Sequence, residues 1–214
     1  PSCRRRVKAA FGDRVLAAMP NVVAYARGDV VRYWLPPAPT KIDEPRADSP
    51  SYVAVREFAD ALSRAGLRGR LELGVHETNP ATTVCFIAIG MTLSLAGSAE
   101  KLIHDETLLA LAASACREGV RLSHRIGTPE PWARLSPVIG APWALAGWLR
   151  MLAKVSPEAL FYAEEHFGRK LKEQHRVMIR EMIELAREKG LPHDAFDELA
   201  RRFAPATAEQ VKSR

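Results

Sequence analysis

Apolar residues recur at intervals of three and four positions between residues 170 and 189, and this spacing predicts an amphipathic helix of about five turns. Seven apolar or weakly polar residues make up the stripe: Leu171, His175, Met178, Ile179, Met182, Leu185 and Ala186. Charged residues fill the opposite side, as on a solvated helix face. We expect Gly190 to end the helix in the left-handed conformation, Pro192 to prevent its continuation, and Asp194 to cap a short final helix.

Helical patterns also account for the rest of the chain from Pro80 onward, where strand signals are lacking. The expected helices cover residues 80–96, 105–126, 141–154, 157–167, 170–189 and 194–203. Residues 79–98 carry no charge and are about as long as a membrane-spanning helix. They also contain threonines, serines, an asparagine and two glycines, and they lack aromatic belts, so a buried core helix is the better prediction.

The first part of the chain shows a different pattern, in which strand signals alternate with one helix. Residues 14–19 are a candidate for a short buried strand, and residues 29–43 read as a hairpin-like pair with a proline-stiffened loop. A helix capped by Ser49 or Ser51 is expected to run to about Ala65, where Gly66 ends it. Residues 70–73 then form a short strand. The apolar stripe of this helix is expected to consist of Val53, Val55, Phe58, Ala59 and Leu62.

Composition narrows the class of protein. The chain has 214 residues, and its hydrophobic content of 47% is ordinary for a soluble globular protein. Its formal net charge of +6 suits an anionic partner such as a phosphorylated cofactor. The basic run at residues 3–8 lacks interleaved aromatics, so a solvated helix face is favoured over nucleic-acid binding. Cys85 and Cys116 lie in apolar runs as expected for buried thiols, and the chain opens without a signal-peptide pattern, so we expect a cytoplasmic protein.

Several stretches resemble the ketopantoate reductase (2-dehydropantoate 2-reductase) family. They are residues 11–16 (FGDRVL), 28–33 (GDVVRY), Gly66 before the LEL at 71–73, 115–119 (ACREG), and 181–199 with its GLP at 190–192. The likeness covers nearly the whole chain as a pattern of elements. Members of this family are oxidoreductases that use NADPH to reduce a 2-keto acid to a 2-hydroxy acid.

The resemblance implies an α+β or α/β fold, with a partial Rossmann-type lobe of short strands and one helix followed by an all-helical domain of the 6-phosphogluconate-dehydrogenase-like type. It places the last part of a cofactor domain at residues 1–73, a helical substrate-binding and dimerisation domain at 79–203, and a flexible tail at 204–214. The implied partners are a small 2-keto acid and a second copy of the chain, with neither nucleic acid nor membrane.

NADP is the implied cofactor, but the sequence departs from the family at the motif that should bind it. A dinucleotide site needs a G-x-G-x-x-G turn after its first strand, so that backbone amides can approach the pyrophosphate at a helix N-terminus. The thirteen glycines of this chain nowhere take that spacing. We therefore expect the chain to be the C-terminal portion of such a reductase, without a cofactor-binding residue of its own and inactive alone.

The proton donor is the second departure. The family places a lysine near the start of the first helix of the substrate domain, and this sequence has no lysine from Ile42 through Glu100. His76 and Asn79 lie in the matching region and are the candidate catalytic residues, since a histidine can donate a proton near neutral pH. The alternative is structural: His76 as a surface loop residue and Asn79 as the cap of the next helix.

The third departure concerns substrate binding. The family has a glutamate about four turns before the glycine that matches Gly190, and that position holds Gln174 here. Gln174 and Glu181, one heptad further on, are the candidate substrate-binding residues, although a structural polar residue at the helix edge explains Gln174 equally well. His175 is expected to be a satisfied core histidine rather than a catalyst, and we expect no metal site. A rival hypothesis makes the chain a non-catalytic dimerisation or interaction module, which predicts an exposed apolar seam across residues 141–203.

Overall fold

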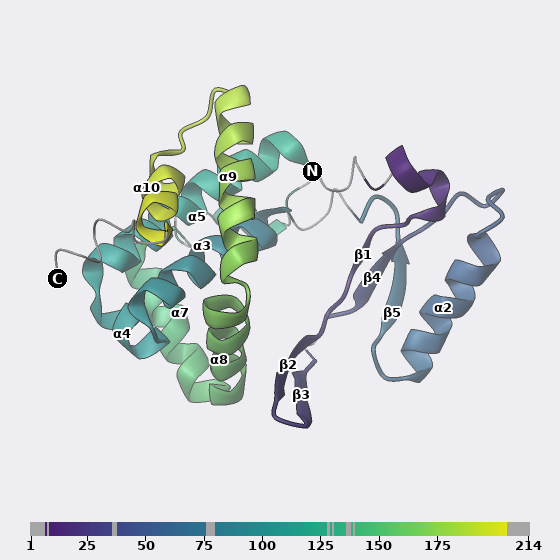
Figure 1. The fold of residues 1–214 in the computed structure, drawn as a ribbon, viewed down its shortest axis with the longest axis horizontal. Helices are drawn as coiled ribbons and strands as arrows, with labels where there is room; N and C mark the ends of the chain where they lie inside the picture. The colour runs from purple at the N-terminus through teal and green to yellow at the C-terminus, as the bar shows by residue number, and fades with distance from the viewer. Residues whose placement is uncertain are drawn as a thin grey trace. The chain divides into compact units, whose positions relative to one another are not determined.

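The computed structural model describes residues 7, 9–35, 38–75, 80–127, 129, 131–135, 138 and 140–204, and it divides the chain into two compact units, Pro1–Thr78 and Asn79–Arg214 (Figure 1). Strands occur in the first unit, and helices make up the second wherever the chain is described. The layout is therefore α+β, with a small mixed sheet preceding a helical unit. Residues 205–214, most of the predicted tail, lie outside the described part of the chain.

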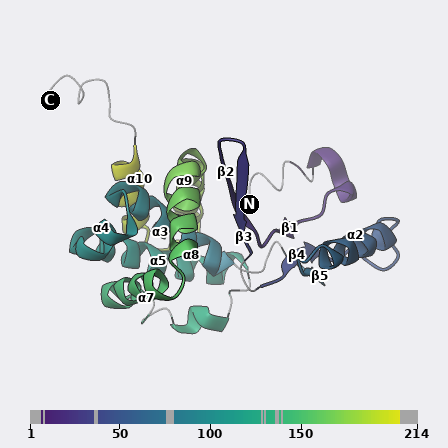
Figure 2. The same ribbon diagram turned by 90° about the horizontal axis from the view of Figure 1, so that it is seen from below.

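Three short strands form the sheet of the first unit, in the order β1 (Ala18–Met19), β4 (Thr40–Asp43) and β5 (Gly69–Glu72). β1 pairs antiparallel with β4, and β4 pairs parallel with β5 with Ile42 opposite Leu71. A parallel pair needs a crossover, which helix α2 (Tyr52–Arg64) supplies. α2 runs beside β5 (Figures 1 and 2), and a Cβ added at Gly69 would lie 2.3 Å from the carbonyl oxygen of Ala59, so this contact requires glycine.

The expected hairpin at residues 29–43 is wrong. The hairpin instead joins β2 (Val23–Arg27) to β3 (Val30–Trp34), with Val23 opposite Trp34, while β4 belongs to the other sheet. The reason is the two-residue turn that begins at Gly28, whose φ of +63° is a conformation that glycine adopts at little cost.

The expected strand at residues 14–19 is also largely wrong. A short 3-10 helix, η1 (Gly12–Arg14), takes its beginning, and only Ala18–Met19 pairs as β1. Ala18 is exposed rather than buried, because β1 lies at the edge of the sheet. The predicted strand at residues 70–73 is confirmed as β5, one residue earlier.

Helix α2 is confirmed, but its apolar stripe is only partly buried. Ala59 is buried, whereas the side chains of Val53 and Phe58 are 64% and 55% exposed. The strands beside α2 are four residues long at most, so they cover only a narrow part of the helix. Gly66 follows α2 with a φ of +81°, which confirms the predicted stop.

The helical unit contains the six predicted helices, with one division and two additions, α4 and η2, that the sequence pattern did not indicate. Its elements are α3 (Pro80–Ala96), α4 (Ala99–His104), α5 (Glu106–Ile126), η2 (Pro131–Leu135), α7 (Pro142–Val155), α8 (Pro157–Ala163), the π-helix η3 (Glu164–Lys170), α9 (Lys172–Glu188) and α10 (Asp194–Phe203). Helix α4 was not predicted, and the expected helix at 157–167 continues as the π-helix η3. α10 packs against α5 and α9 (Figures 1 and 2).

Helix α3 lies in the core of this unit, as its uncharged sequence predicts. Ala81, Val84, Ala88 and Met91 are each at most 4% exposed and pack with α5, α9 and α10. No helix in the described part of the chain combines the length and the apolar character that crossing a membrane requires.

Local signals set the ends of the predicted helices. The Asp105 carboxylate accepts a hydrogen bond from the backbone N–H of Leu108 at 2.9 Å and so caps α5. After α9, Gly190 takes a φ of +63°, and the N–H of Leu191 donates to the carbonyl of Ala186 at 2.8 Å. This closure is a Schellman-type end and confirms the predicted role of Gly190.

Candidate functional site

The two candidate catalytic residues, His76 and Asn79, lie outside the described residues. Their roles therefore stay predictions from the sequence. The described residues nearest to them in the chain are Val75, which is buried, and Ala81, which is fully buried at the start of α3.

The two candidate substrate-binding residues lie on one side of α9. Gln174 and Glu181 are seven residues apart, which corresponds to about two turns and roughly 10 Å along the helix. Gln174 is exposed, and its Nε2 lies 3.5 Å from the Sδ of Met178, a weak acceptor. Glu181 is half-buried. The pair thus presents an amide and a carboxylate along one edge of the helix, whose apolar stripe faces the core.

His175 follows Gln174 and is the most unusual polar side chain of the unit. It is 2% exposed, and its Nδ1 has no hydrogen-bond partner among the residues that the structure describes. Burial, together with the neighbouring His166, lowers the pKa of His175 to about 4, so the imidazole is neutral near pH 7. The predicted burial is confirmed, but the prediction that this histidine is satisfied is wrong at Nδ1.

The imidazole of His175 fits against α3 because residue 90 is glycine. A Cβ added at Gly90 would lie 2.7 Å from Cε1 of His175 and 3.0 Å from the Cβ of Phe167. Helices α3, α9 and η3 therefore pack so closely at Gly90 that its side chain can be only a hydrogen atom. The sequence contains one signal for this close packing, which is a glycine inside an apolar helix. It does not show which residue faces that glycine.

The π-helix η3 provides the third wall of this meeting point. Phe167 stacks on Phe86 of α3 with ring centroids 5.0 Å apart, and His166 approaches the edge of Phe167 at 4.9 Å. Glu164 at the start of η3 accepts a hydrogen bond from the backbone N–H of Ala99 at 2.6 Å and so ties η3 to the first turn of α4. Such π segments are frequent at functional sites, which makes this part of the unit a candidate.

A small pocket opens beside η3, between α3, α7 and α8. The residues that line it, all apolar, include Phe86, Gly90, Leu93, Trp148, Leu160 and Phe167. The pocket has a volume of about 10 Å³, which is close to the space that one water molecule needs. A 2-keto acid does not fit this volume, and its carboxylate would find no charge partner on these walls.

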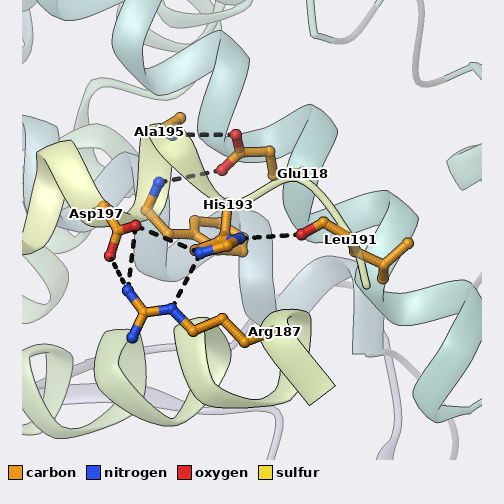
Figure 3. A network of polar contacts seen from close by, with 7 residues as sticks. Glu118, Arg187, Leu191, His193, Ala195 and Asp197 are labelled. Carbon is orange, nitrogen blue, oxygen red and sulfur yellow. Dashed lines mark hydrogen bonds and ion pairs between the residues drawn. The ribbon is translucent and has the colours of Figure 1, made fainter. Parts of the chain in front are cut away.

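A buried carboxylate on α5 forms the best-defined polar network of the unit (Figure 3). Glu118 is 7% exposed, and its two oxygens accept hydrogen bonds from the backbone N–H groups of Ala195 and Phe196 at 3.0 and 3.1 Å. Glu118 thus caps α10, where Asp194 had been predicted to do so. Burial raises the pKa of the Glu118 carboxyl, and the two N–H donors oppose that rise.

The connection between α9 and α10 forms the solvent-exposed side of the same network (Figure 3). Arg187 donates from Nε to Nε2 of His193 at 3.0 Å and from Nη2 to Asp197 at 3.2 Å, while Nδ1 of His193 lies 3.0 Å from the carbonyl of Leu191. Nε2 of His193 also lies 3.5 Å from Asp197, so the imidazole contacts both Arg187 and Asp197. Every group here has a partner within the network, so the arrangement positions α10 rather than offering a ligand site.

Metal binding finds no support in the described part of the chain, where no three His, Cys, Asp or Glu side chains gather closely enough to hold an ion. Comparisons with protein-family models, with curated proteins and with solved structures found no match for this chain.

Proposed function

We propose that this chain is the C-terminal portion of an NAD(P)H-dependent reductase that resembles ketopantoate reductase and reduces a 2-keto acid to a 2-hydroxy acid. The observation that supports this proposal most is the unit β4–α2–β5, a parallel pair joined by a helix, placed directly before an all-helical unit. Parallel βαβ units are the building blocks of dinucleotide-binding domains. This support is an analogy of fold, and the finer Rossmann and 6-phosphogluconate-dehydrogenase-like assignments are parts of the proposal.

The residues of this chain do not fit the dinucleotide itself. The connection from β4 to α2, residues 44–51 (EPRADSPS), contains two prolines and no glycine, and the buried Pro45 occupies its beginning. Backbone amides of this connection cannot approach a pyrophosphate as a glycine-rich turn would. The proposal therefore assigns NADP binding to another part of the complete protein. The connection from β4 to α2 takes no part in the proposed reaction.

In the proposal, His76 donates the proton to the alkoxide that develops on the keto oxygen, and Asn79 orients that oxygen. The amide of Gln174 donates to the substrate carboxylate, and Glu181 accepts from a substrate hydroxyl. His175 is excluded as the donor, because a pKa of about 4 leaves it without a proton to give near pH 7. This assignment keeps the acid–base chemistry on residues 76–79 and the binding on the exposed edge of α9.

The test uses the protein encoded by the complete gene. NADPH oxidation is followed by absorbance with a panel of branched and linear 2-keto acids, in the wild type, in Gln174→Ala and in Glu184→Ala. We expect Gln174→Ala to raise KM by roughly tenfold, the size of one lost hydrogen bond to a charged group. Glu184 is exposed on the same helix and serves as the matched control, with unchanged kinetics. If none of the 2-keto acids accelerates NADPH oxidation by the complete protein, the proposed function is wrong.

A specific observation favours the second candidate function, a non-catalytic dimerisation or interaction module. On α7, the side chains of Trp143, Met151 and Val155 are 70%, 53% and 79% exposed and recur at intervals of four or eight residues, so they share one side of the helix. Sedimentation equilibrium of the wild type and of Trp143→Ser tests this surface: a dimer that the substitution dissociates, in a protein that fails the keto-acid assay, supports the module. A monomer at all concentrations in both proteins removes this alternative.

A further inference from the structure

Two cysteines face each other in the core of the helical unit. Cys85 lies on α3 and Cys116 on α5, both are free thiols, and their side chains are 7% and 3% exposed. The Sγ of Cys85 lies 4.0 Å from the carbonyl oxygen of Cys116, and the Sγ of Cys116 lies 4.0 Å from the carbonyl oxygen of Cys85.

We propose that Cys85 and Cys116 are a redox modification site, a dithiol that closes to an intramolecular disulfide and thereby locks α3 to α5. The inference goes beyond the proposed function, since it requires neither a keto acid nor a nicotinamide cofactor. It rests on the reciprocal contacts, in which each sulfur lies 4.0 Å from the backbone carbonyl oxygen of the other cysteine.

The residues next to the two cysteines also show that α3 and α5 pack closely. Val84 precedes Cys85, and Gly119 lies one turn after Cys116. A Cβ added at Gly119 would lie 2.7 Å from a methyl carbon of Val84, so the two helices approach as closely as glycine allows. A disulfide needs Cα atoms about 4.4–6.8 Å apart, so only closely packed helices can be joined by one.

The reaction is a two-electron oxidation with a small-molecule disulfide as the co-reactant. One thiolate attacks a sulfur of the oxidant and releases one thiol, and the second cysteine then displaces the other thiol from the mixed disulfide. One S–S bond forms and one breaks, and the two protons and two electrons of the cysteines end on the two released thiols. A diazenedicarboxamide oxidant such as diamide accepts the same protons and electrons at its N=N bond.

The environment predicts that this oxidation is slow. The neighbouring Cys85 and burial raise the pKa of the Cys116 thiol well above its usual value, so little thiolate forms at neutral pH. An oxidant reaches the pair only when α3 and α5 separate locally. Once formed, the bond closes a loop between residues 31 positions apart and constrains the unfolded chain, so oxidation raises Tm.

The test uses the full chain and a Cys3→Ser variant, which leaves Cys85 and Cys116 as the only cysteines. The folded protein is treated with diamide, unfolded in the presence of N-ethylmaleimide, and measured by intact mass and peptide mapping. We expect a loss of two hydrogens without alkylation, a peptide joining the two cysteines, and a rise in Tm of roughly 5 °C or more that dithiothreitol reverses. Cys3→Ser/Cys85→Ser is the control and gains no such stability.

Three outcomes would overturn the proposal. The first is full alkylation of both cysteines after exposure to diamide for longer than the global unfolding time. The second is a diamide adduct or a sulfinic acid at one cysteine without a bond between the two. The third is a bond that forms only when denaturant is present during oxidation, which would assign it to the unfolded chain. None of these outcomes affects the keto-acid assay, so the two proposals fail independently.

Discussion

The contact between Gly119 and Val84 gives the sharpest quantitative prediction, because the chain provides a matched control. In Gly119→Ala the new methyl group would lie 2.7 Å from Cγ2 and 3.0 Å from Cβ of Val84. Valine is stiff about χ1 and its Cβ follows the backbone, so α3 and α5 must move apart. Such overpacking costs about 1–3 kcal/mol. Alanine has a higher helix propensity than glycine, and this offsets about 1 kcal/mol of the overpacking cost. The expected net destabilisation is therefore about 0–2 kcal/mol.

Gly147, in the middle of the exposed side of α7, isolates the helical preference. A Cβ added there would meet nothing within 4 Å among the described atoms, so Gly147→Ala is expected to stabilise the fold by about 1 kcal/mol. Urea unfolding followed by circular dichroism measures both variants, and the two free energies of unfolding should differ by about 1–3 kcal/mol at similar m-values. Val84→Ala should relieve part of the cost of Gly119→Ala, as a coupling in a double-mutant cycle. Equal stabilisation by both glycine substitutions would refute the close approach of α3 and α5.

The remaining predictions concern Glu118 and His175. Glu118→Ala leaves two buried backbone N–H groups of α10 without their acceptors and should lower the free energy of unfolding by about 2–4 kcal/mol, and Glu118→Gln, which keeps one acceptor oxygen, should lower it by less. Urea denaturation measures both, and an unaffected Glu118→Ala would contradict the capping role. The pKa of His175 is about 4 in the folded state, below its value of 6.5 in the unfolded chain. The free energy of unfolding therefore keeps its full value above about pH 6.5 and falls as the pH is lowered towards 4. The wild type should lose about 2–3 kcal/mol more than His175→Met between neutral pH and about pH 4.5, and equal losses in the two proteins would contradict the neutral, buried imidazole.

The parts of the fold that the sequence predicted are those whose cause is local. Asp105 caps a helix that begins at the next residue, and Gly190 ends a helix at its own position, so each signal and its effect lie within one turn. The strand pairing failed because β4 lies near β3 in the sequence but pairs with β5, across the whole of α2. The prolines within residues 36–39 predicted a loop between strands, but they did not indicate which strands would pair.

The candidate site was less predictable, for the same physical reason. The cap of α10 comes from Glu118, 77 residues earlier in the chain, while Asp194 stood at the position where local rules expect a cap. A sequence pattern cannot show that a distant carboxylate satisfies these N–H groups. The sequence carries no pattern that marks the π-helix η3, in which Phe167 stacks on Phe86 of the distant helix α3. His76 and Asn79 stay predictions, as they lie outside the described residues.

Helix α3 explains how these features depend on one another. Val84 meets Gly119 of α5, Cys85 meets Cys116 of the same helix, and Gly90 meets His175 of α9, so three close contacts occur within seven residues of one helix. Each contact requires a small or unbranched group at one side and fixes the separation of two backbones. His175 is adjacent to Gln174, so the contact at Gly90 also fixes how far the exposed edge of α9 stands from α3. The packing of α3 therefore positions the exposed edge of α9 that carries Gln174 and Glu181.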